Sequence, residues 1–442
     1  MSDNVVVGKS YRPYHPNADL LLPPSLREWL PENHLAYFVS DVVDNLDLSA
    51  MDAVYGNEKR GQPPYDPRMM TKVLVYAYCV GVFSSRRIAR RLVEDIAFRV
   101  LAADNQPDFR TISDFRKIHL GTLEGLFEQA LQIALEAGAM KLGRVALDGT
   151  KVKANASKHK AMSYDRMVEK QKTLKAEVKE LLLEAEAADA AEDARHGKNQ
   201  SGDELPEELK RREDRLRKIR EAKRVVEQRA RAKAEAEGQD PKKAKPQAKD
   251  QYNFTDPESR IMRGADGIVQ GYNAQAAVEP GLQLIVGQTV TQAANDKEQL
   301  TPMIAVIEEQ SGQRPEEVLA DSGYCSEKNL EALESEESSE RRIEGFIATE
   351  RLRHDEYKQP CPKGPLPKNA TRVDRMRRKL KTKAGKAVYA ARKAIVEPVF
   401  GQIKQARGFR QFLLRGIAKV RGEWALVCLT HNILKLHRLC YE

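Results

Sequence analysis

The stretch Arg144-Val-Ala-Leu-Asp148-Gly-Thr-Lys-Val-Lys-Ala-Asn-Ala156 decides the fold expected for this chain. In it, a short apolar run ends in a single carboxylate, Asp148, and a glycine follows. A bounded apolar run of this length is typical of a buried strand, so the carboxylate is expected at the edge of a sheet. Asp before Gly is also a common turn sequence, which is the simpler reading of this residue alone.

A second stretch has the same design, because Glu317-Val-Leu-Ala-Asp321-Ser-Gly-Tyr again places an Asp directly after an apolar run. A third acid, Glu397, lies in a strongly basic helical segment. Phosphoryl transfer on nucleic acid needs two divalent ions about 3.5–4 Å apart, and Mg²⁺ or Mn²⁺ prefers carboxylate oxygens. We therefore expect Asp148, Asp321 and Glu397 to hold two Mg²⁺ or Mn²⁺ ions.

The order of elements around these acids predicts the fold class. Outside a charged insertion, the pattern runs strand, strand, strand, helix, strand, helix, strand, helix, with Asp148 ending the first strand and Asp321 the fourth. This order is typical of an α/β ribonuclease-H-like (integrase-like) domain, in which the first and fourth strands lie side by side. Asp148 and Asp321 are therefore expected to be neighbours in space.

The segment 158–250 interrupts that domain and is dominated by Lys, Glu, Ala and Arg. Apolar residues recur at heptad-like spacing in two stretches, separated by the polar segment 190–203, which predicts an antiparallel helical hairpin. These residues are Met167, Leu174, Val178, Leu181 and Ala185, then Leu209, Leu216, Ile219 and Val226. A disordered charged linker is the alternative.

Residues 1–140 are expected to form an all-α DNA-binding domain ahead of the catalytic one. Met69–Val82 has the pattern of a buried helix, and Ser84 begins a second helix with apolar residues on one face and four exposed cations on the other. These cations are Arg86, Arg87, Arg90 and Arg91. With the helix that starts at Asp108, the pattern fits a helix-turn-helix DNA reader, although a solvated basic face on a helical bundle has the same periodicity.

The segment around Glu397 adds groups that bind phosphate. Tyr389, Lys393, Glu397 and Lys404 fall near one helical face, so the two lysines are expected to hold the phosphates of the cleaved strand and Tyr389 to add a contact. A surface ladder of ion pairs is the ordinary alternative. Pro398 disfavours helical geometry at the preceding residue, so a kink or a restart of the helix is expected at Glu397.

Composition limits the class of protein. The 442 residues contain 74 Lys and Arg against 65 Asp and Glu, and the resulting charge of +9 favours a polyanionic partner. Five widely spaced cysteines indicate neither a zinc ribbon nor a disulfide framework. We find no signal-peptide core and no apolar stretch of about 18 residues, so we expect a cytoplasmic, nucleoid-associated protein without a membrane partner.

These motifs resemble those of the DDE transposases of bacterial insertion sequences, and are closest to the insertion-sequence 1182 group. The resemblance rests on Leu147-Asp-Gly-Thr-Lys, Ala320-Asp-Ser-Gly-Tyr and Val396-Glu-Pro-Val-Phe-Gly-Gln-Ile-Lys. Three further segments are similar to the family, namely Tyr65-Asp-Pro-Arg, Asp256-Pro-Glu-Ser-Arg and Gly271-Tyr-Asn-Ala-Gln. The likeness covers nearly the whole chain apart from the charged insertion.

The resemblance implies that Asp148, Asp321 and Glu397 are the catalytic, metal-binding triad. It also implies a Tyr-Arg-Glu-Lys signature that binds DNA, formed by Tyr389, Arg392 or Lys393, Glu397 and Lys404. One departure is clear, because the family spacing counted back from Glu397 would place Tyr and Arg at the positions of Ala390 and Lys393. Tyr389 and Arg392 are each one residue out of that register.

The function expected is therefore that of a transposase. It would bind the terminal inverted repeats of double-stranded DNA, cut with metal-activated water, and join the freed 3′-hydroxyl to target DNA as a homodimer or larger synaptic assembly. A metal-dependent nuclease without strand transfer and a catalytically decayed DNA-binding protein are the alternatives. The expected domains are 1–140, a catalytic domain in two parts (141–157 and 251–442), and the insertion 158–250.

Overall fold

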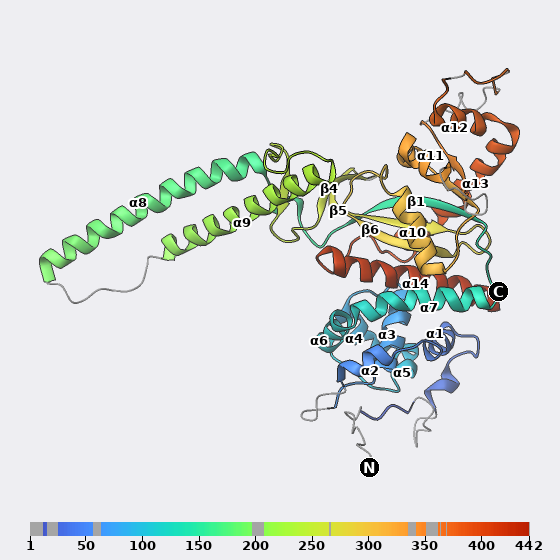
Figure 1. Ribbon diagram of the computed structural model, residues 1–442. Coiled ribbons are helices and arrows are strands. Elements are labelled where there is room, and N and C mark those ends of the chain that lie inside the picture. The colour runs from blue at the N-terminus through green and yellow to red at the C-terminus, as the bar shows by residue number, and fades with distance from the viewer. Residues whose placement is uncertain are drawn as a thin grey trace, which may run out of the picture. The chain divides into compact units, whose positions relative to one another are not determined.

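A computed structural model describes residues 12–15, 25–55, 63–196, 207–264, 267–334, 342–350, 361–362, 364–367 and 369–441 (Figure 1). The chain forms two compact units. The first comprises Met1–Ala154, Arg263–Ala265 and Tyr272–Glu442, and the second comprises Asn155–Met262 and Asp266–Gly271. Within the described residues, no helix is long and apolar enough to cross a membrane.

A mixed sheet lies mainly in the first unit, and two of its segments, residues 260–262 and 267–271, belong to the second unit. Its strands are β1 (Arg144–Lys153), β4 (Arg260–Gly264), β5 (Gly267–Val278), β6 (Ile285–Thr291), β7 (Glu317–Ala320) and β8 (Glu344–Ile347). They follow the order β4-β5-β1-β7-β8, with β6 paired to β5. β1 runs parallel to β7, from the pair Arg144 and Glu317 to the pair Leu147 and Ala320. The prediction that the strands of Asp148 and Asp321 are neighbours is confirmed, although β4 makes β7 the fifth strand of this sheet rather than the fourth.

The apolar runs that predicted these two strands are fully buried. Val145, Ala146 and Leu147 in β1 have no exposed surface, and neither do the last three residues of β7. Strands inside a sheet that is covered on both faces read as continuous apolar runs rather than as alternating ones. Burial of the two runs therefore explains why they hold the centre of the sheet.

Helices alternate with the later strands as the sequence predicts. They are α10 (Leu300–Ser311), α11 (Glu327–Glu334), α12 (Arg372–Lys381) and α13 (Lys383–Gly401). α10 packs against β6, whereas α13 contacts β1, β7 and β8. This mixed α/β arrangement, with its sheet order, is consistent with a ribonuclease-H-like fold.

The described N-terminal residues form helices. After a short 3₁₀ helix at Leu26–Trp29 come α1 (Leu35–Asp44), α2 (Ser49–Tyr55), α3 (Pro67–Cys79), α4 (Ser85–Glu94), α5 (Ile96–Leu101), α6 (Phe109–Ile118) and α7 (Leu120–Glu136). α4 and α6 are the two helices expected of a helix-turn-helix pair, and they contact each other. The additional helix α5 lies between them, because Asp95 is extended and caps a new helix through the N–H of Ala97.

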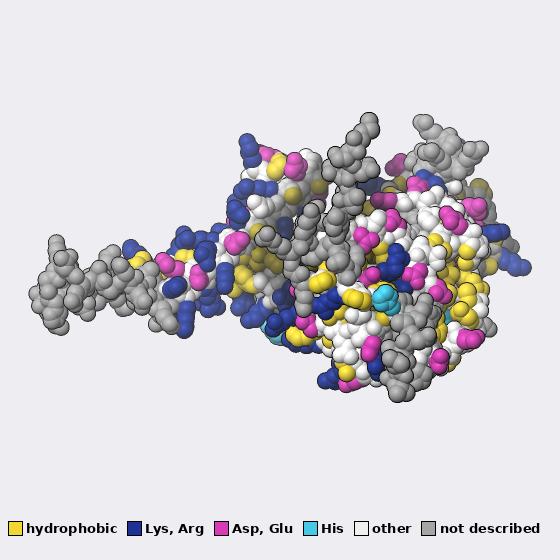
Figure 2. All heavy atoms as spheres, turned by 90° about the horizontal axis from the view of Figure 1, so that it is seen from below, with side chains coloured by type: hydrophobic (Ala, Val, Ile, Leu, Met, Phe, Trp, Pro, Cys, Tyr) yellow, Lys and Arg dark blue, Asp and Glu magenta, His cyan; other side chains and the backbone are white. Residues whose placement is uncertain are grey.

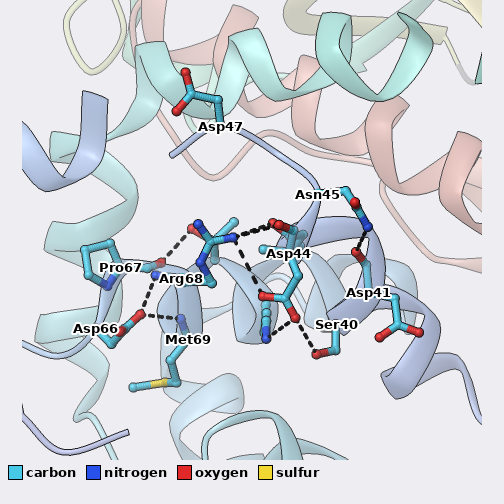
Figure 3. A network of polar contacts seen from close by, with 12 residues as sticks. Ser40, Asp41, Asp44, Asn45, Asp47, Asp66, Pro67, Arg68 and Met69 are labelled. Carbon is cyan, nitrogen blue, oxygen red and sulfur yellow. Dashed lines mark hydrogen bonds and ion pairs between the residues drawn. The ribbon is translucent and has the colours of Figure 1, made fainter. Parts of the chain in front are cut away.

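The motif Tyr65-Asp-Pro-Arg joins α1 to α3 (Figure 3). Asp66 caps α3, because its Oδ1 accepts the N–H groups of Arg68 at 2.7 Å and Met69 at 3.0 Å. The guanidinium of Arg68 then donates to the carbonyls of Val43 and Asp44 at the end of α1. A cap and a basic group on the last carbonyls satisfy the polar groups of both helix ends.

The long helix α14 (Ile417–Tyr441) packs against α3, α7 and β6 (Figure 1). Its Asn432 side chain exchanges two hydrogen bonds of 2.8 Å with the backbone of Ile285 in β6. Trp424, fully buried, donates to the carbonyl of Gln275 in β5. The N-terminal helices and the sheet therefore share the core around α14, and the domain boundary at residue 140 stays a prediction.

A fully buried acid, Glu423, ties this core together. It accepts a hydrogen bond from the hydroxyl of Tyr78 at 3.3 Å and from the backbone N–H groups of Leu413 and Leu414. Arg116 donates to the same hydroxyl at 2.9 Å. Burial raises the pKa of Glu423, although the Arg116 charge opposes that shift. The carboxylate thus links α3, α6, α14 and the loop that precedes α14.

The second unit is a hairpin of two long helices, α8 (Tyr164–His196) and α9 (Glu207–Ala236), which lie side by side (Figure 1). Short strands β2 (Ala161–Ser163) and β3 (Gln251–Asn253) pair antiparallel at its base. The Tyr164 hydroxyl donates to Glu227 across the pair of helices. The apolar residues buried between the helices are Met167, Leu174, Leu216, Ile219, Ala222 and Val226.

Candidate active site

Asp148 lies inside β1, which continues to Lys153, so the expectation that Asp148 ends its strand is wrong. Asp321 follows the last residue of β7, as expected. Asp148 and Asp321 each follow the last residue of the parallel pairing, Leu147 in β1 and Ala320 in β7. The N–H of Gly149 donates to Asp148, and the N–H of Gly323 donates to Asp321, both at 2.8 Å. The negative charge of Asp321 acts on Asp148, so the structure brings these predicted residues together.

Arg392 of α13 joins the third predicted acid to the first. One terminal nitrogen of its guanidinium lies 3.3 Å from Oδ2 of Asp148, and the other lies 3.5 Å from Oε1 of Glu397. The Arg392 side chain is 8% exposed, whereas that of Glu397 is 54% exposed. A planar guanidinium can hold two carboxylates at once, and here it stands between two members of the predicted triad.

Burial dominates the electrostatics of Asp148. It raises the pKa of Asp148 to about 6, with a further rise from Asp321 that the Arg392 charge opposes. Burial would lower the pKa of Arg392, but the neighbouring acids, Asp148 first among them, outweigh it and raise that pKa. Asp148 is therefore an acid that retains its proton to a higher pH than an exposed Asp does.

Helix α13 does not break at Glu397, so the expected restart of the helix is wrong, and the kink stays a prediction. The α-helix runs from Lys383 to Gly401 with Pro398 inside it. Pro398 has no N–H for the carbonyl of Ala394 four residues earlier, which would leave that carbonyl without a partner. The side chain of Gln283, in the turn between β5 and β6, donates to the Ala394 carbonyl at 2.9 Å instead. A distant residue thus supplies the missing hydrogen bond.

Lys404 lies just beyond α13 in a π-helical turn, Gln402–Ala406. Its ammonium group donates to the Thr150 hydroxyl and, at 2.9 Å, to the carbonyl of Lys151, both in β1. Single π-helical turns are frequent at functional sites because they redirect side chains. The turn places the Lys404 ammonium group beside the strand that carries Asp148.

The other residues of the expected signature differ in their surroundings. Tyr389 is half-buried, and its charge when ionised would act on Arg392. Lys393, in the register of the family spacing, is exposed on α13. Of the two candidates for the signature arginine position, Arg392 contacts the acids of the site, as the ion pairs with Asp148 and Glu397 show.

The sequence pattern missed one acid of this site, Asp296. Asp296 lies in the loop between β6 and α10, whose cap residue is Gln299. The Oδ1 atom of Asp296 accepts hydrogen bonds from Asn273 at 2.6 Å and Gln275 at 2.7 Å, both in β5. These donors belong to the motif Gly271-Tyr-Asn-Ala-Gln, so that motif was the sequence feature that could have pointed to Asp296.

Asp296 also pairs with Lys151 of β1, whose ammonium lies 3.4 Å from Oδ1. Burial lowers the pKa of Lys151, and Asp296 opposes that change. The Tyr324 hydroxyl, buried next to the site, donates to the Gln275 side chain that holds Asp296. Burial first, and then Asp296 and Asp148, raise the pKa of Tyr324 well above its usual value, so this hydroxyl remains a donor.

Only a glycine fits at position 149, because the neighbouring side chains leave no room for a Cβ atom. A Cβ atom at this position would lie 2.3 Å from the Gln275 amide nitrogen and 2.7 Å from Asp296 Oδ1. Such contacts would displace the hydrogen bonds that hold Asp296. The glycine after Asp148 therefore allows close packing inside β1.

The residues present match the chemistry of a hard divalent cation, because Asp148, Asp321, Glu397 and Asp296 supply carboxylate oxygens. No group of three or more His, Cys, Asp or Glu side chains in the described part of the chain is close enough to hold a metal ion. Two of these acids, Asp148 and Glu397, are separated by the Arg392 guanidinium, which stands between them.

The four arginines expected to read DNA all lie exposed on α4. Arg86 stacks over the Phe109 ring at 5.1 Å, and two others form ion pairs along the helix, Arg90 with Glu94 and Arg91 with Asp95. Exposed pairs of this kind contribute little to stability, so the cations remain available to a polyanion.

Comparison with known proteins gives two family models, one at each end of the chain. A transposase domain of the family DUF772 matches residues 24–118. A transposase DDE domain matches residues 366–437, the part that carries Arg392, Glu397 and Lys404. No curated protein and no solved structure matches the chain. Neither model distinguishes the insertion-sequence 1182 group, so that assignment stays a prediction.

Proposed function

The two matched models indicate that this chain is a DDE transposase of the insertion-sequence type, and from that premise we propose that it cuts and joins DNA at a site formed by Asp148, Asp321 and Glu397. Its substrates would be the terminal inverted repeats of its element and a target duplex. The parallel pairing of β1 with β7 carries this proposal, because it brings together Asp148 inside β1 and Asp321 directly after β7.

The chain's own residues would divide the work as follows. Asp148, Asp321 and Glu397 would hold Mg²⁺ or Mn²⁺, two ions in all. Arg392, and Lys404 from the π-helical turn, would hold the phosphates of the cleaved strand, together with Tyr389 and Lys393. When bound, the ions would neutralise charge on the attacking and leaving oxygens of an in-line displacement.

Sequence-specific contact with the element ends is proposed for the N-terminal helices. The exposed Arg86, Arg87, Arg90 and Arg91 on α4 support this, because cations on one helix face suit a duplex backbone and its base edges. Two copies or more would hold the two ends of an element together. Light scattering of the protein alone and with end DNA would measure that assembly.

The test is Mg²⁺-dependent cleavage and joining of a duplex that carries the element's terminal repeats. We expect native protein to release cut ends and to form joined products, whereas Asp321→Ala binds the duplex without cutting it. A matched control is Glu309→Ala, which removes an exposed acid of α10 and should cut normally.

Two outcomes would replace the proposal. Cut products without joined ones would indicate a metal-dependent nuclease that lacks strand transfer. Binding of the repeats with no cutting by native protein in Mg²⁺ or Mn²⁺ would indicate a DNA-binding protein that has lost its catalytic activity.

A further inference from the structure

The two helices of the hairpin differ in charge. Helix α9 contains 12 Lys and Arg residues against 7 Asp and Glu residues, whereas α8 contains 6 against 9. Figure 2 shows Lys and Arg side chains, with fewer Asp and Glu among them, on the part of the hairpin that is not drawn in grey. The excess of cations gives α9 a positive potential, which favours a polyanionic partner.

The cations of α9 form a row, which we call the basic stripe. It consists of Lys210, Arg217, Arg220, Arg224 and Arg231, all exposed. Four of them recur every seven residues, so they lie close to one line along the helix. At about 1.5 Å per residue the stripe is about 32 Å long, which corresponds to about nine base pairs of a duplex.

The stripe faces away from the core of the hairpin. Leu216, Ile219, Ala222 and Val226 point toward α8 and are buried. With about 100° between successive residues, the stripe lies on the opposite side of α9. Packing of the hairpin therefore neither uses nor covers these cations.

Few acids neutralise the stripe. Arg217 pairs with Asp214 at 2.7 Å, with both side chains at least half exposed. Arg220, Arg224 and Arg231 form no ion pair with any residue that the structure describes. Glu213 and Glu235 lie near the two ends of the stripe, and Glu227 of the same helix is engaged by Tyr164. Glu221 lies about one turn from Arg217 and Arg224, but forms no ion pair with either of them. The guanidinium groups of these three stripe residues are thus open to an anion.

The rest of the α9 surface indicates which class of molecule the basic stripe would bind. Among the described residues, none of the large exposed hydrophobic side chains lies on α9. The helix also contains no aromatic residue. Protein interfaces use apolar and aromatic anchors, and single-stranded nucleic acid is held by stacking on aromatic rings. A straight row of cations without such groups suits the regular phosphates of a duplex.

We propose that the basic stripe of α9 binds the phosphate backbone of double-stranded DNA without regard to sequence. This interaction rests on the proposed function only in that a transposase acts on DNA. It would be separate from recognition of the element ends and from the acids of the catalytic site. The hairpin would thereby add affinity for flanking or target duplex.

The test is the salt dependence of binding by the full chain to a duplex of about 30 base pairs of unrelated sequence. The stripe variant is Arg220→Gln/Arg224→Gln/Arg231→Gln, and glutamine has nearly the helix propensity of arginine. The control is Lys172→Gln/Lys175→Gln/Lys179→Gln, which removes three exposed cations from α8 of the same hairpin. Circular dichroism establishes that both variants keep their helices.

The logarithm of affinity falls with the logarithm of salt by about 0.9 for each phosphate contact. We expect the stripe variant to reduce this slope by about 2 to 3, and the α8 control to change it by less than about 1. Equal slopes for the two variants would overturn the proposal. An equal loss of affinity for single-stranded DNA or RNA would overturn it as well.

Failure of the proposed function would look different. If native protein binds duplex through the stripe but neither cuts nor joins the terminal repeats in Mg²⁺, the catalytic proposal fails and the stripe stands. If native protein cuts and joins, while the stripe variant and the α8 control bind alike, only the stripe fails.

Discussion

The pKa of Asp148 depends strongly on the groups that surround its side chain. Its carboxylate lies between a second acid and a buried guanidinium, and burial raises its pKa from 3.8 to about 6. The folded protein therefore holds this proton more tightly than the unfolded chain does. Stability that depends on Asp148 is present at low pH and is lost as the pH rises through about 6.

The first prediction concerns Asp148→Asn in metal-free protein. Below about pH 4 the variant and the native protein should be equally stable, and above about pH 6 the variant should be more stable, by at most about 3 kcal/mol. Urea unfolding with a chelator, at several pH values, measures the difference. Asp114→Asn, an exposed acid of α6, should show no such trend. A constant difference between native protein and Asp148→Asn would contradict this account.

The second prediction concerns Arg392→Gln, which leaves Asp148 and Glu397 without the cation between them. Removal of one partner from a buried ion pair costs about 3–5 kcal/mol. We expect a loss of that order near pH 8 and a smaller loss near pH 5, because a protonated Asp148 needs no counter-charge. Added Mg²⁺ should increase the stability of the variant more than that of the native protein. In the variant, the ion can take the position of the lost guanidinium and supply its positive charge.

The neighbouring substitution Lys393→Gln is the matched control for Arg392→Gln. Lys393 is exposed, so its loss should change the unfolding free energy by less than about 0.5 kcal/mol. If Lys393→Gln destabilises the protein as much as Arg392→Gln does, the family register is the relevant one and the assignment of Arg392 is wrong.

The third prediction concerns Asp296→Asn. Asn273, Gln275 and Lys151 all donate toward Asp296, so an amide in its place would face donors with its own NH₂ group or lose charge-assisted hydrogen bonds. We expect a loss of stability of about 1–3 kcal/mol and slower cleavage in Mg²⁺. Unfolding curves and single-turnover cleavage measure the two effects, and full activity would exclude Asp296 from the site.

At the scale of elements, helix α13 depends on a residue far from it in sequence. The Gln283 side chain fills the hydrogen-bonding gap that Pro398 leaves at the Ala394 carbonyl, and it also accepts from Lys435 of α14. Gln283 has a φ of 61°, so its backbone is held in the left-handed region. This turn between β5 and β6 therefore keeps α13 regular up to Glu397.

The fourth prediction is a double-mutant cycle between these two positions. Gln283→Ala should cost about 1–2 kcal/mol, because the Ala394 carbonyl loses its donor. In Gln283→Ala/Pro398→Ala, the new N–H at residue 398 can donate to that carbonyl, so part of the loss should be recovered. Strictly additive effects in urea unfolding would show that the two sites act independently.

The elements that sequence reasoning found and missed differ in one physical respect. β1 and β7 were predicted correctly because burial of a central strand leaves a continuous apolar run that a single sequence displays. Two features were not predicted, namely the continuity of α13 through Pro398 and the position of Asp296. The first depends on Gln283, and the second depends on the hydrogen-bond donors of β5. The local sequence around Pro398 or Asp296 does not show which distant side chains will contact these residues.

At the scale of the molecule, the two regions matched by family models share one buried network. Tyr78 and Arg116 belong to residues 24–118, and Glu423 belongs to residues 366–437. α14 also packs along α3 and α7. We therefore expect the N-terminal helices and the sheet to unfold together rather than in separate steps.

The fifth prediction tests that coupling with Glu423→Ala. The change leaves Arg116 buried without its acid and removes the acceptor of two backbone N–H groups, which should cost about 3–5 kcal/mol. Hydrogen exchange should rise together in α3 and in residues 413–424. Loss of protection in residues 413–424 with normal protection in α3 would show two independent parts. Glu309→Ala on the surface should leave both unchanged.

The acids of the candidate site lie far apart in the sequence, which affects when the site can form during synthesis of the chain. The ribosome completes Asp148 early, the segment that forms the hairpin follows, and Asp321, Glu397 and Lys404 come late, with α14 last. Because β6 and the N-terminal helices pack against α14, the acids cannot be fixed in place until α14 has been synthesised. A chain that stops before α14 would therefore carry the exposed arginines of α4 without the packed arrangement of Asp148, Asp321 and Glu397.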